Sequence, residues 1–569
     1  MSFDIKKNTE CRLRDGVLLR ADVYCPSGKG RHPVLICRTP YDKSHPRYVR
    51  IASEIATMGY IAVVQDIRGR CESEGEWVWH MTKEGQKVES LDGYDACEWA
   101  ADLKGSNGKV GTWGNSYPSW LIWRMSAARP PSLKAIFTSG FSVRTLECTY
   151  GVFETGVRLR WQHHMAVSSR ARIGDMAYPT STEDANHYWD NILRSKWLWH
   201  IPLNEVPDAL FGPTAGMQRQ YWQEIAEEHW NIDQIHPHVN VPTCTLTGWW
   251  DRLNAAVGHF SGMVTTGPEE KRSSHRLIIG PWVHDVEGKG DLGGLRSYGS
   301  NAVCNLSRRL IRWYDHHLKF IDNGVADEGP VQIFILNDNR WCNVPSWPPP
   351  GMEELPLYLH SNGAANTPAG NGSLSIDAPG LEPPDTYTYD PSNPVMSLVE
   401  SDGQVSACDQ KPLAARRDIL VYQTPPLKEQ ILLAGPVKLV LYAASDCPDT
   451  DFIARLIEVD AKGLAVNIAQ GLIRGRYRNG YDREVTLVQG ETNELLIRIS
   501  VVGIRFRRGS RIRLDITSSD FPKFDRNHNT GDPFHIDTKL RIAQQTILHD
   551  MTYPSHLKLP VITDESEWS

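Results

Sequence analysis

The chain has 569 residues, 40% of them hydrophobic and 23% charged, a length that suits about three domains at roughly 100–200 residues each. Its formal net charge of -7 and pI near 6.3 exclude the basic character typical of proteins that bind nucleic acid or anionic membranes. We therefore expect neither a nucleic acid nor a membrane as a partner.

The N-terminus and the cysteines both favour a cytoplasmic protein. No apolar signal segment follows Met1, and no run of about 18 apolar residues occurs anywhere. The 11 cysteines are scattered without a Cys-x-x-Cys pair, so we expect mostly buried, reduced thiols and no zinc site. The 19 tryptophans are unusually many and predict large aromatic clusters, some of them lining a pocket.

The first part of the chain alternates strand and helix patterns. Four short runs predict strands, at residues 17–24, 34–37, 60–64 and 110–113. The first of them follows an Asp15-Gly16 turn and belongs to an early hairpin, and a helical stretch around 96–103 precedes the last. This alternation predicts a mostly parallel sheet covered by helices.

Strand patterns vanish between about residues 144 and 240. Polar residues there mix with tryptophans, at positions 161, 189, 197, 199, 222 and 230. This composition predicts a helical insertion that caps the sheet. Strand-like runs return at 243–247 and 276–279, and a helical stretch follows around 306–318.

The proline cluster at 347–351 is a strong break. Beyond it, strand-like runs separated by polar turns recur, at 437–442, 452–456, 494–499 and 512–516. This pattern predicts an all-β sandwich or jelly roll at the C-terminal end.

Ser116 is the candidate nucleophile. It lies between the strand at 110–113 and a helix-like run, which is the context that a nucleophile elbow requires. Gly114 relieves crowding on the tight turn, and Pro118, where a second glycine is usual, suits the first turn of a helix. The backbone N–H of Tyr117 would face a developing oxyanion. The motif alone supports a chance Gly-x-Ser turn equally well.

Asp251 and His284 complete a candidate catalytic triad. A serine hydroxyl needs an adjacent base, and in α/β-hydrolases the order along the chain is Ser, then Asp or Glu, then His. Asp251 follows the strand-like run at 243–247, and His284 follows the run at 276–279. Both therefore fall at strand ends, where such sheets build their sites. Asp251 would hold the imidazole tautomer, and His284 would move the proton.

Other histidines offer rival bases. They are His163-His164, His236-Pro237-His238 and His316-His317. None of these histidines follows a strand pattern in the order that the triad requires. We interpret them as surface or cap residues. A Gly-x-Gly-x-x-Gly match at 288–293 does not lie between a strand and a helix, so we reject dinucleotide binding.

The order of short motifs along nearly the whole chain resembles one family. They are Arg14-Asp15-Gly16-Val17, Pro40-Tyr41-Asp42-Lys43, Gln65-Asp66-Ile67-Arg68-Gly69, Ser73-Glu74-Gly75, Gly114-x-Ser116-Tyr117, Gly248-Trp249-x-Asp251, Gly280-Pro281-Trp282-x-His284, Tyr389-Asp390-Pro391, Asp409-Gln410-x-Pro412, Asp449-Thr450-Asp451-Phe452 and Phe521-Pro522-Lys523-x-Asp525-Arg526-Asn527. This series resembles the family of bacterial cocaine esterases, X-Pro dipeptidyl-peptidases and α-amino-acid ester hydrolases, which are serine hydrolases.

The resemblance implies an α/β fold: an α/β-hydrolase domain with an inserted helical cap and a C-terminal jelly roll. Its expected boundaries are 1–143 and 241–350 for the two parts of the hydrolase domain, 144–240 for the cap and 351–569 for the jelly roll. It also implies that Ser116, Asp251 and His284 form the triad. Tyr41 would share the oxyanion hole with the Tyr117 amide, although a core aromatic after a strand is the alternative.

The substrate pocket departs from the family pattern. Arg252 and Leu253 follow Asp251 where a family member has a small residue and an aromatic, so Leu253 would line the acyl pocket. Trp161 resembles a pocket aromatic of the family, with a plain packing tryptophan as the alternative. We therefore expect Trp161, Leu253 and Trp250 to line the pocket, and we do not assume cocaine as the substrate.

Together these features predict a serine esterase that acts on a small molecule through an acyl-enzyme, without a metal or an organic cofactor. An amidase or aminopeptidase would use the same triad, and would need carboxylates near the pocket to bind an amine. Glu154, Asp175, Glu183 and Asp184 are the carboxylates available in the cap. The triad would equally serve a transferase or cyclase, which passes the acyl group to an acceptor other than water. A non-catalytic binding protein is the remaining hypothesis.

Overall fold

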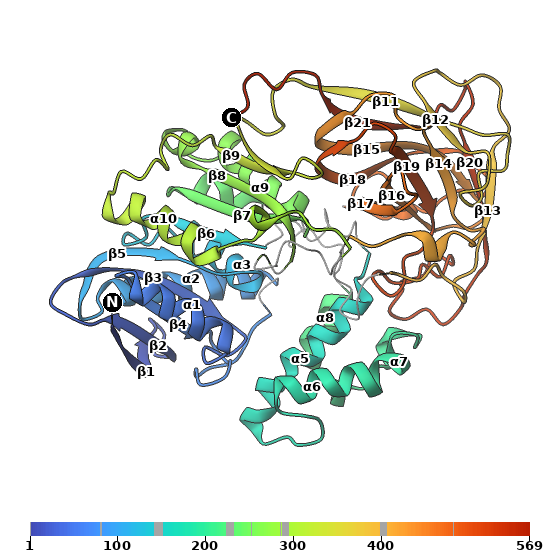
Figure 1. Cartoon of the computed structure of the whole chain (residues 1–569). Helices are drawn as coiled ribbons and strands as arrows, with labels where there is room; N and C mark the ends of the chain where they lie inside the picture. The colour runs from blue at the N-terminus through green and yellow to red at the C-terminus, as the bar shows by residue number, and fades with distance from the viewer. Residues whose placement is uncertain are drawn as a thin grey trace.

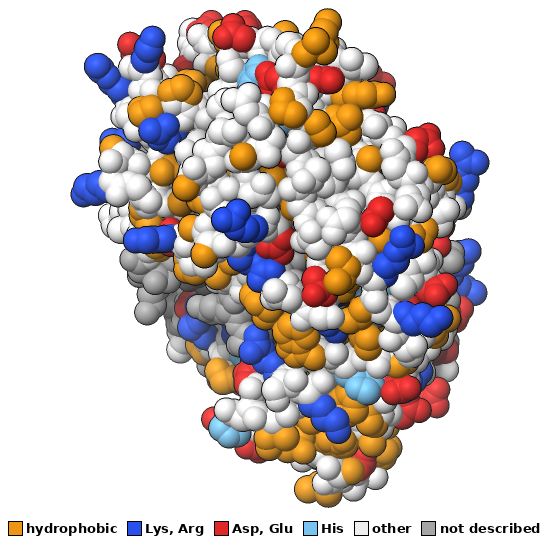
Figure 2. Space-filling model, turned by 90° about the vertical axis from the view of Figure 1, so that its right-hand side faces the viewer, with side chains coloured by type: hydrophobic (Ala, Val, Ile, Leu, Met, Phe, Trp, Pro, Cys, Tyr) orange, Lys and Arg blue, Asp and Glu red, His pale blue; other side chains and the backbone are white. Residues whose placement is uncertain are grey.

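A computed structural model describes residues 2–79, 82–140, 152–223, 233–251, 253–284, 286, 295–398, 407–481 and 483–569, with the backbone alone at 233, 253 and 254 (Figure 1). Its strands form two five-stranded sheets and one eleven-stranded sheet. No helix within the described ranges has the length and apolar composition needed to cross a bilayer. On the face shown in Figure 2, acidic and basic side chains are interspersed.

The first sheet contains, in spatial order, β1 (Phe3–Arg12), β2 (Leu18–Pro26), β4 (Ile61–Asp66), β3 (His32–Thr39) and β5 (Ser106–Thr112). The accompanying helices are α1 (Pro46–Thr57), α2 (Lys83–Ala101) and α3 (Tyr117–Ala127). Strands β1 and β2 form the predicted hairpin, and β3 pairs in parallel with both β4 and β5. Every residue of β4 is buried, which explains its continuous apolar run.

The second sheet contains β10 (Arg340–Val344), β9 (Val331–Ile335), β8 (Arg276–Val283), β7 (Thr243–Trp250) and β6 (Ile136–Ser139). Strands β6 to β9 are parallel, and β10 turns back antiparallel to β9. Helix α9 (Leu253–Thr265) follows β7, and α10 (Leu306–Lys319) has a strongly apolar face directed at the core.

The two sheets meet between β5 and β6, where only isolated bridges join Val110 to Leu133 and Asn115 to Ser139. Between these bridges, Tyr314 of α10 replaces a strand partner. Its hydroxyl accepts the Thr112 N–H at 2.7 Å and donates to the Thr112 carbonyl. A side chain from a helix thus forms the backbone hydrogen bonds that a neighbouring strand would otherwise supply at the end of β5, just before the Ser116 turn.

Helices and turns alone make up the described residues 152–223. The α-helices are α5 (Thr155–Ile173), α6 (Thr182–Tyr188), α7 (Arg194–Trp197) and α8 (Ala215–Gln223). In Figure 1 they lie below the sheets as a separate layer. Helix α5 contacts the loop that follows β4. Arg70 in that loop donates to the carbonyl of Met165 in α5 at 2.8 Å.

The C-terminal part is β-rich, as expected. Its strands are β11 (Met352–His360), β12 (Ser373–Ser375), β13 (Asp385–Tyr389), β14 (Leu420–Gln423), β15 (Ile431–Ser445), β16 (Asp451–Val459), β17 (Ala465–Arg474), β18 (Asn493–Phe506), β19 (Arg511–Thr517), β20 (Ala543–Leu548) and β21 (His556–Ile562). One hydrophobic core runs from β7, β8 and β9 into these strands. The β-rich domain therefore packs directly on the second sheet.

Most described cysteines are buried, as the sequence predicts. Seven of the ten in the described ranges are buried and three are half-buried. Cys148 lies outside the described residues.

Candidate active site

Ser116 lies on a strained turn between β5 and α3. Its backbone has φ of 65° and ψ of -122°, a conformation that side-chain-bearing residues rarely adopt. A Cβ on Gly114 would approach Cβ of Pro118 to 2.6 Å, so only glycine fits there. Pro118 stands in the first turn of α3, as the sequence predicts. The geometry is that of a nucleophile elbow.

Ser119 and Ser139 brace this turn. The Ser119 hydroxyl contacts the carbonyls of both Gly114 and Ser139 at 2.7 Å, and it accepts the Ser139 N–H at 3.0 Å. The Ser116 N–H donates to the Ser139 carbonyl at 3.0 Å. No local sequence pattern distinguishes these two serines from the others in the chain.

Asp251 and His284 meet at the carboxyl ends of β7 and β8. The Nδ1 atom of His284 lies 2.6 Å from Oδ1 of Asp251. The Asp251 side chain is 1% exposed and that of His284 is 25% exposed, so the carboxylate is buried while the ring reaches solvent. Thr247 donates its hydroxyl to the other Asp251 oxygen at 3.2 Å. A carboxylate held in this way fixes the ring and its tautomer.

Asn115 connects the serine turn to the histidine. Its side-chain amide donates to the His284 carbonyl at 3.5 Å, and its Oδ1 accepts from the Ser139 hydroxyl at 2.9 Å. A Cβ on Gly140 would come within 2.5 Å of that Oδ1, so glycine is needed for this close approach. The neighbour of Ser116 is thereby tied to the backbone of His284.

Tyr41 lies beside Ser116. The Trp161 indole N–H donates to the Tyr41 oxygen at 3.1 Å. Burial raises the pKa of Tyr41, while the bond from Trp161, the positive charges of Arg158 and Arg70 and the nearby Ser116 side chain oppose the rise. Tyr41 is therefore a neutral phenol at neutral pH, able to donate a hydrogen bond.

The residues expected to line the pocket occupy different places. Trp161 lies on α5 against Tyr41, with its ring centroid 5.1 Å from that of Trp79. Trp250 is buried, and its indole donates to the Asn467 carbonyl of β17 at 3.3 Å. Trp250 therefore connects β7 of the second sheet to the β-rich domain. Leu253 begins α9, but its side chain lies outside the described residues, as does all of Arg252.

The rival histidines are not all surface residues. His163 and His164 lie on α5, and burial lowers the pKa of each to about 4. His236 is buried with its Nε2 at 3.0 Å from Nδ1 of His259. His163, His164 and His236 all lie within 144–240, the segment expected to form the cap, and aromatic neighbours from other segments contact them. His316 and His317 are half-buried, and residues 288–293 lie outside the described part.

The structure groups three possible metal ligands, Asp42, Asp66 and Cys71, whose ligand atoms lie within 4.8 Å of one another. Lys43 already pairs with Asp66, its Nζ at 2.9 Å from Oδ2. An ammonium group in this position supplies the positive charge that the buried carboxylate requires. The arrangement is thus explained as an ion pair.

Two family models match the chain. The X-Pro dipeptidyl-peptidase (S15 family) model matches residues 15–285. The model for the X-Pro dipeptidyl-peptidase C-terminal non-catalytic domain matches residues 323–558. The first match contains Ser116, Asp251 and His284, and the second contains most of the β-rich domain.

Single relatives agree with these matches. The cocaine esterase of Rhodococcus sp. (strain MB1 Bresler) is 30% identical over 99% of this chain and 99% of its own. A crystal structure of an aminopeptidase from a marine sediment archaeon (Thaumarchaeota) has a TM-score of 0.84 at 23% identity, covering 99% of this chain and 97% of that one. An α-amino acid ester hydrolase structure has a TM-score of 0.80 at 23% identity, covering 98% and 96%.

Proposed function

Because this chain belongs to the X-Pro dipeptidyl-peptidase (S15) family of serine hydrolases, we propose that it cleaves a carboxylic ester of a small molecule through an acyl-enzyme on Ser116. The observation that carries this proposal is the 2.6 Å contact between His284 and Asp251 beside the strained Ser116 turn. The reaction requires no metal or organic cofactor, since the three side chains supply a nucleophile, a base and an orienting acid.

The first half-reaction forms the acyl-enzyme. His284 takes the proton of the Ser116 hydroxyl as the oxygen attacks the substrate carbonyl, and Asp251 stabilises the imidazolium. The Tyr117 N–H and the Tyr41 hydroxyl donate to the oxyanion, and removal of one such donor typically costs about 3–4 kcal/mol of transition-state stabilisation. The tetrahedral intermediate collapses, the ester C–O bond breaks, and His284 protonates the leaving alcohol.

The second half-reaction returns the free enzyme. His284 takes a proton from water as the water oxygen attacks the acyl carbon, and then returns a proton to the Ser116 oxygen as the acid leaves. We further propose that α5 to α8 form a cap over this site, that the β-rich domain is a jelly roll, and that the enzyme works in the cytoplasm. Trp161 would be part of the pocket wall.

Two carboxylates of the helical segment are already paired, which favours an ester over a substrate with a free N-terminal amine. Glu154 lies 2.9 Å from Arg158, and Asp175 lies 4.0 Å from Arg170, so a cation already faces each of them. Glu183 and Asp184 are exposed at the start of α6. An ammonium group would gain little from carboxylates that are already paired. Amide cleavage and acyl transfer to another acceptor would use the same catalytic residues, and a substrate panel separates them from ester hydrolysis.

The test is active-site labelling combined with that substrate panel. A fluorophosphonate probe should label wild-type protein at Ser116, and Ser116→Ala should lose the label and at least about 10⁴-fold in kcat on aryl and alkyl esters. Exposed Ser27→Ala is the matched control and should keep both. Matched anilides test amide cleavage, and added alcohols or hydroxylamine test acyl transfer. Ester turnover that persists in Ser116→Ala would refute the proposal.

A further inference from the structure

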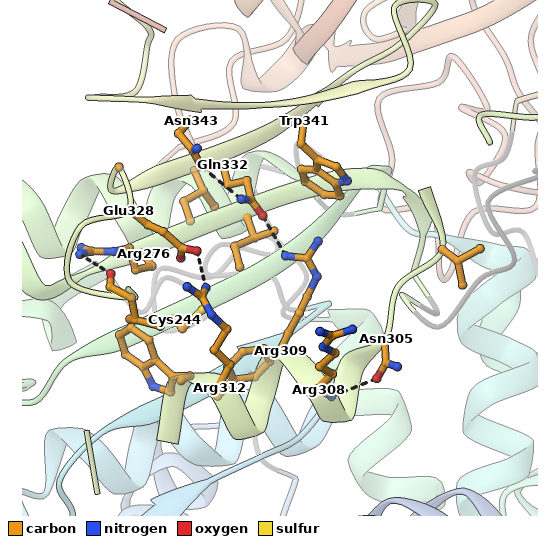
Figure 3. Close-up of a pocket in the computed structure, with 17 residues that line it drawn as sticks. Cys244, Arg276, Asn305, Arg308, Arg309, Arg312, Glu328, Gln332, Trp341 and Asn343 are labelled. Carbon is orange, nitrogen blue, oxygen red and sulfur yellow. Dashed lines mark hydrogen bonds and ion pairs between the residues drawn. The ribbon is translucent and has the colours of Figure 1, made fainter. Parts of the chain in front are cut away.

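A cavity of about 420 Å³ lies between α10 and strands β8, β9 and β10 (Figure 3). Cys244, near the start of β7, is one of its lining residues, whereas Asp251 follows the other end of that strand. Cys244 precedes Asp251 by seven residues, which corresponds to roughly 23 Å along an extended chain. Ser116, Asp251 and His284 are not among the lining residues, so the cavity is separate from the candidate active site.

Much of the cavity wall is apolar. Phe137 and Leu277 come from the second sheet, Trp313 from α10 and Trp341 from β10. Val303 is 48% exposed, so part of the apolar wall is in contact with solvent. The volume falls within the range of roughly 300–1,000 Å³ that is usual for small-molecule sites.

Arg309 carries an oriented charge that pairs with no carboxylate among the described residues. Figure 3 shows it rising from α10 toward Gln332, to whose Oε1 it donates at 2.8 Å. Gln332 in turn donates to Asn343 at 3.2 Å, and the guanidinium lies 4.7 Å from the centre of the Trp341 ring. Gln332 and Trp341 are both neutral, so they fix the guanidinium and leave its positive charge available.

Two further arginines add to this charge. Arg276 donates to the backbone carbonyls of Ser273 and His275, both at 3.0 Å, and its buried Nε has no hydrogen-bond partner. Arg308 is exposed at the cavity edge. The fourth arginine, Arg312, pairs with Glu328, the only carboxylate among the described lining residues. The lining therefore has a net charge of about +3 once this pair is set aside.

We propose that this cavity binds a small amphipathic carboxylate, with its apolar body against Trp313 and Trp341 and its carboxylate on Arg308 and Arg309. A planar guanidinium matches a carboxylate in two parallel hydrogen bonds, and the apolar walls favour a ring or a branched chain behind it. A neutral ligand of the same shape would leave the three arginines without a counter-charge. The site needs no contribution from Ser116, Asp251 or His284.

The test compares a charged probe with its neutral analogue. Calorimetric titration with 1-naphthoate should show saturable binding at one site, and 1-naphthalenemethanol should bind at least 10-fold more weakly. Arg308→Met combined with Arg309→Met should weaken naphthoate at least 10-fold and leave the alcohol unchanged, because methionine keeps an apolar stem without the charge. Val303→Trp, which fills the exposed edge, should weaken both probes.

Two controls make the result decisive. Arg508→Met, at an exposed turn between β18 and β19, removes one arginine elsewhere and should leave binding unchanged. Fluorophosphonate treatment before titration blocks Ser116, so binding that survives it is not at the active site. Four results would each overturn the proposal: equal binding of the two probes, loss of binding after that treatment, an equal loss of affinity in Arg508→Met, or no saturable binding by 5 mM. A Kd of 5 mM corresponds to a binding free energy of about 3 kcal/mol.

Discussion

At the scale of single residues, the bond from Trp161 to Tyr41 decides how the phenol is used. The indole can only donate, so the Tyr41 oxygen must accept from it, at 3.1 Å. The phenol proton is then left for the space beside Ser116. We therefore expect Trp161 to act as a positioning residue for Tyr41.

Trp161→Phe removes the indole donor and keeps an aromatic ring. We expect kcat to fall about 10-fold, in line with a neutral hydrogen bond worth about 1 kcal/mol or slightly more, while KM changes less than threefold. The double variant with Tyr41→Phe measures whether Trp161 acts through the phenol. If it does, Trp161→Phe has no further effect in the Tyr41→Phe background. Losses that simply multiply would contradict a positioning role.

At the scale of secondary-structure elements, the seam between the two sheets is the feature with the largest consequence. Tyr314 of α10 satisfies both backbone groups of Thr112, the last residue of β5. A Cβ on Gly111 would lie 2.3 Å from the Tyr314 ring, so the neighbouring glycine is what allows the ring to enter. The strand before the Ser116 turn therefore depends on a residue that lies 202 positions later in the chain.

Tyr314→Phe leaves the ring and removes the hydroxyl. Because the Thr112 N–H and carbonyl would be buried without a partner, we expect a loss of about 2–4 kcal/mol in the free energy of unfolding, measured in urea. Tyr442→Phe removes an exposed bond to Glu494 and should cost less than about 1 kcal/mol. Similar losses in the two variants would show that Tyr314 has no special role at the seam.

At the scale of the whole molecule, buried histidines make stability depend on pH. Burial lowers the pKa of His163 to about 4, against 6.5 for the free side chain. Between these values the unfolded chain binds a proton that the folded chain does not, so stability falls as pH falls from about 6.5 toward 4. His163 is 1% exposed and its Nδ1 lies 3.1 Å from the Leu210 carbonyl.

His163→Gln should therefore make the protein less sensitive to acid. From the two pKa values, His163 accounts for about 2 kcal/mol of the unfolding free energy that the wild type loses between pH 8 and pH 5. The loss in the variant should therefore be smaller than in the wild type by about 2 kcal/mol. The comparison uses the change with pH within each protein, so a constant packing cost of the variant cancels. Exposed His238→Gln is the control and should follow the wild type. Parallel stability curves for wild type and His163→Gln would refute the assignment.

The parts of the fold that follow local patterns could be predicted from the sequence. The runs at 243–247 and 276–279 lie within β7 and β8, and the elbow has the expected strand and helix on its two sides. Helix α2 was only partly predicted, around 96–103, because Gly85 and Gly93 weaken the helical pattern before it. Gly93 is there for packing: a Cβ would lie 2.7 Å from the Met125 side chain of α3.

The contacts that hold the site could not be predicted, because they join distant segments. Asn115, Ser119 and Tyr314 have no local pattern that marks them, and each acts through a partner that only the folded chain brings near. The same holds for Trp250, whose contact with β17 depends on how the β-rich domain packs. The order of motifs along the chain indicates the family. The residues that support the site become visible only from the tertiary packing.

Two adjacent tryptophans link Asp251 to the C-terminal half of the protein. Trp249 donates to the Phe334 carbonyl at 2.8 Å and lies against Gly503 of β18, where a Cβ would come within 2.3 Å of its ring, while Trp250 reaches β17. The β-rich domain is therefore not an interchangeable module. In a chimaera that joined the first 320 or so residues of this chain to the remainder of a relative, the catalytic groups would be unchanged, yet the strand that presents Asp251 would rest on a foreign surface. Recombination within the family should succeed only where the strand that carries Trp249 and Trp250 is exchanged together with the β-strands that it packs against.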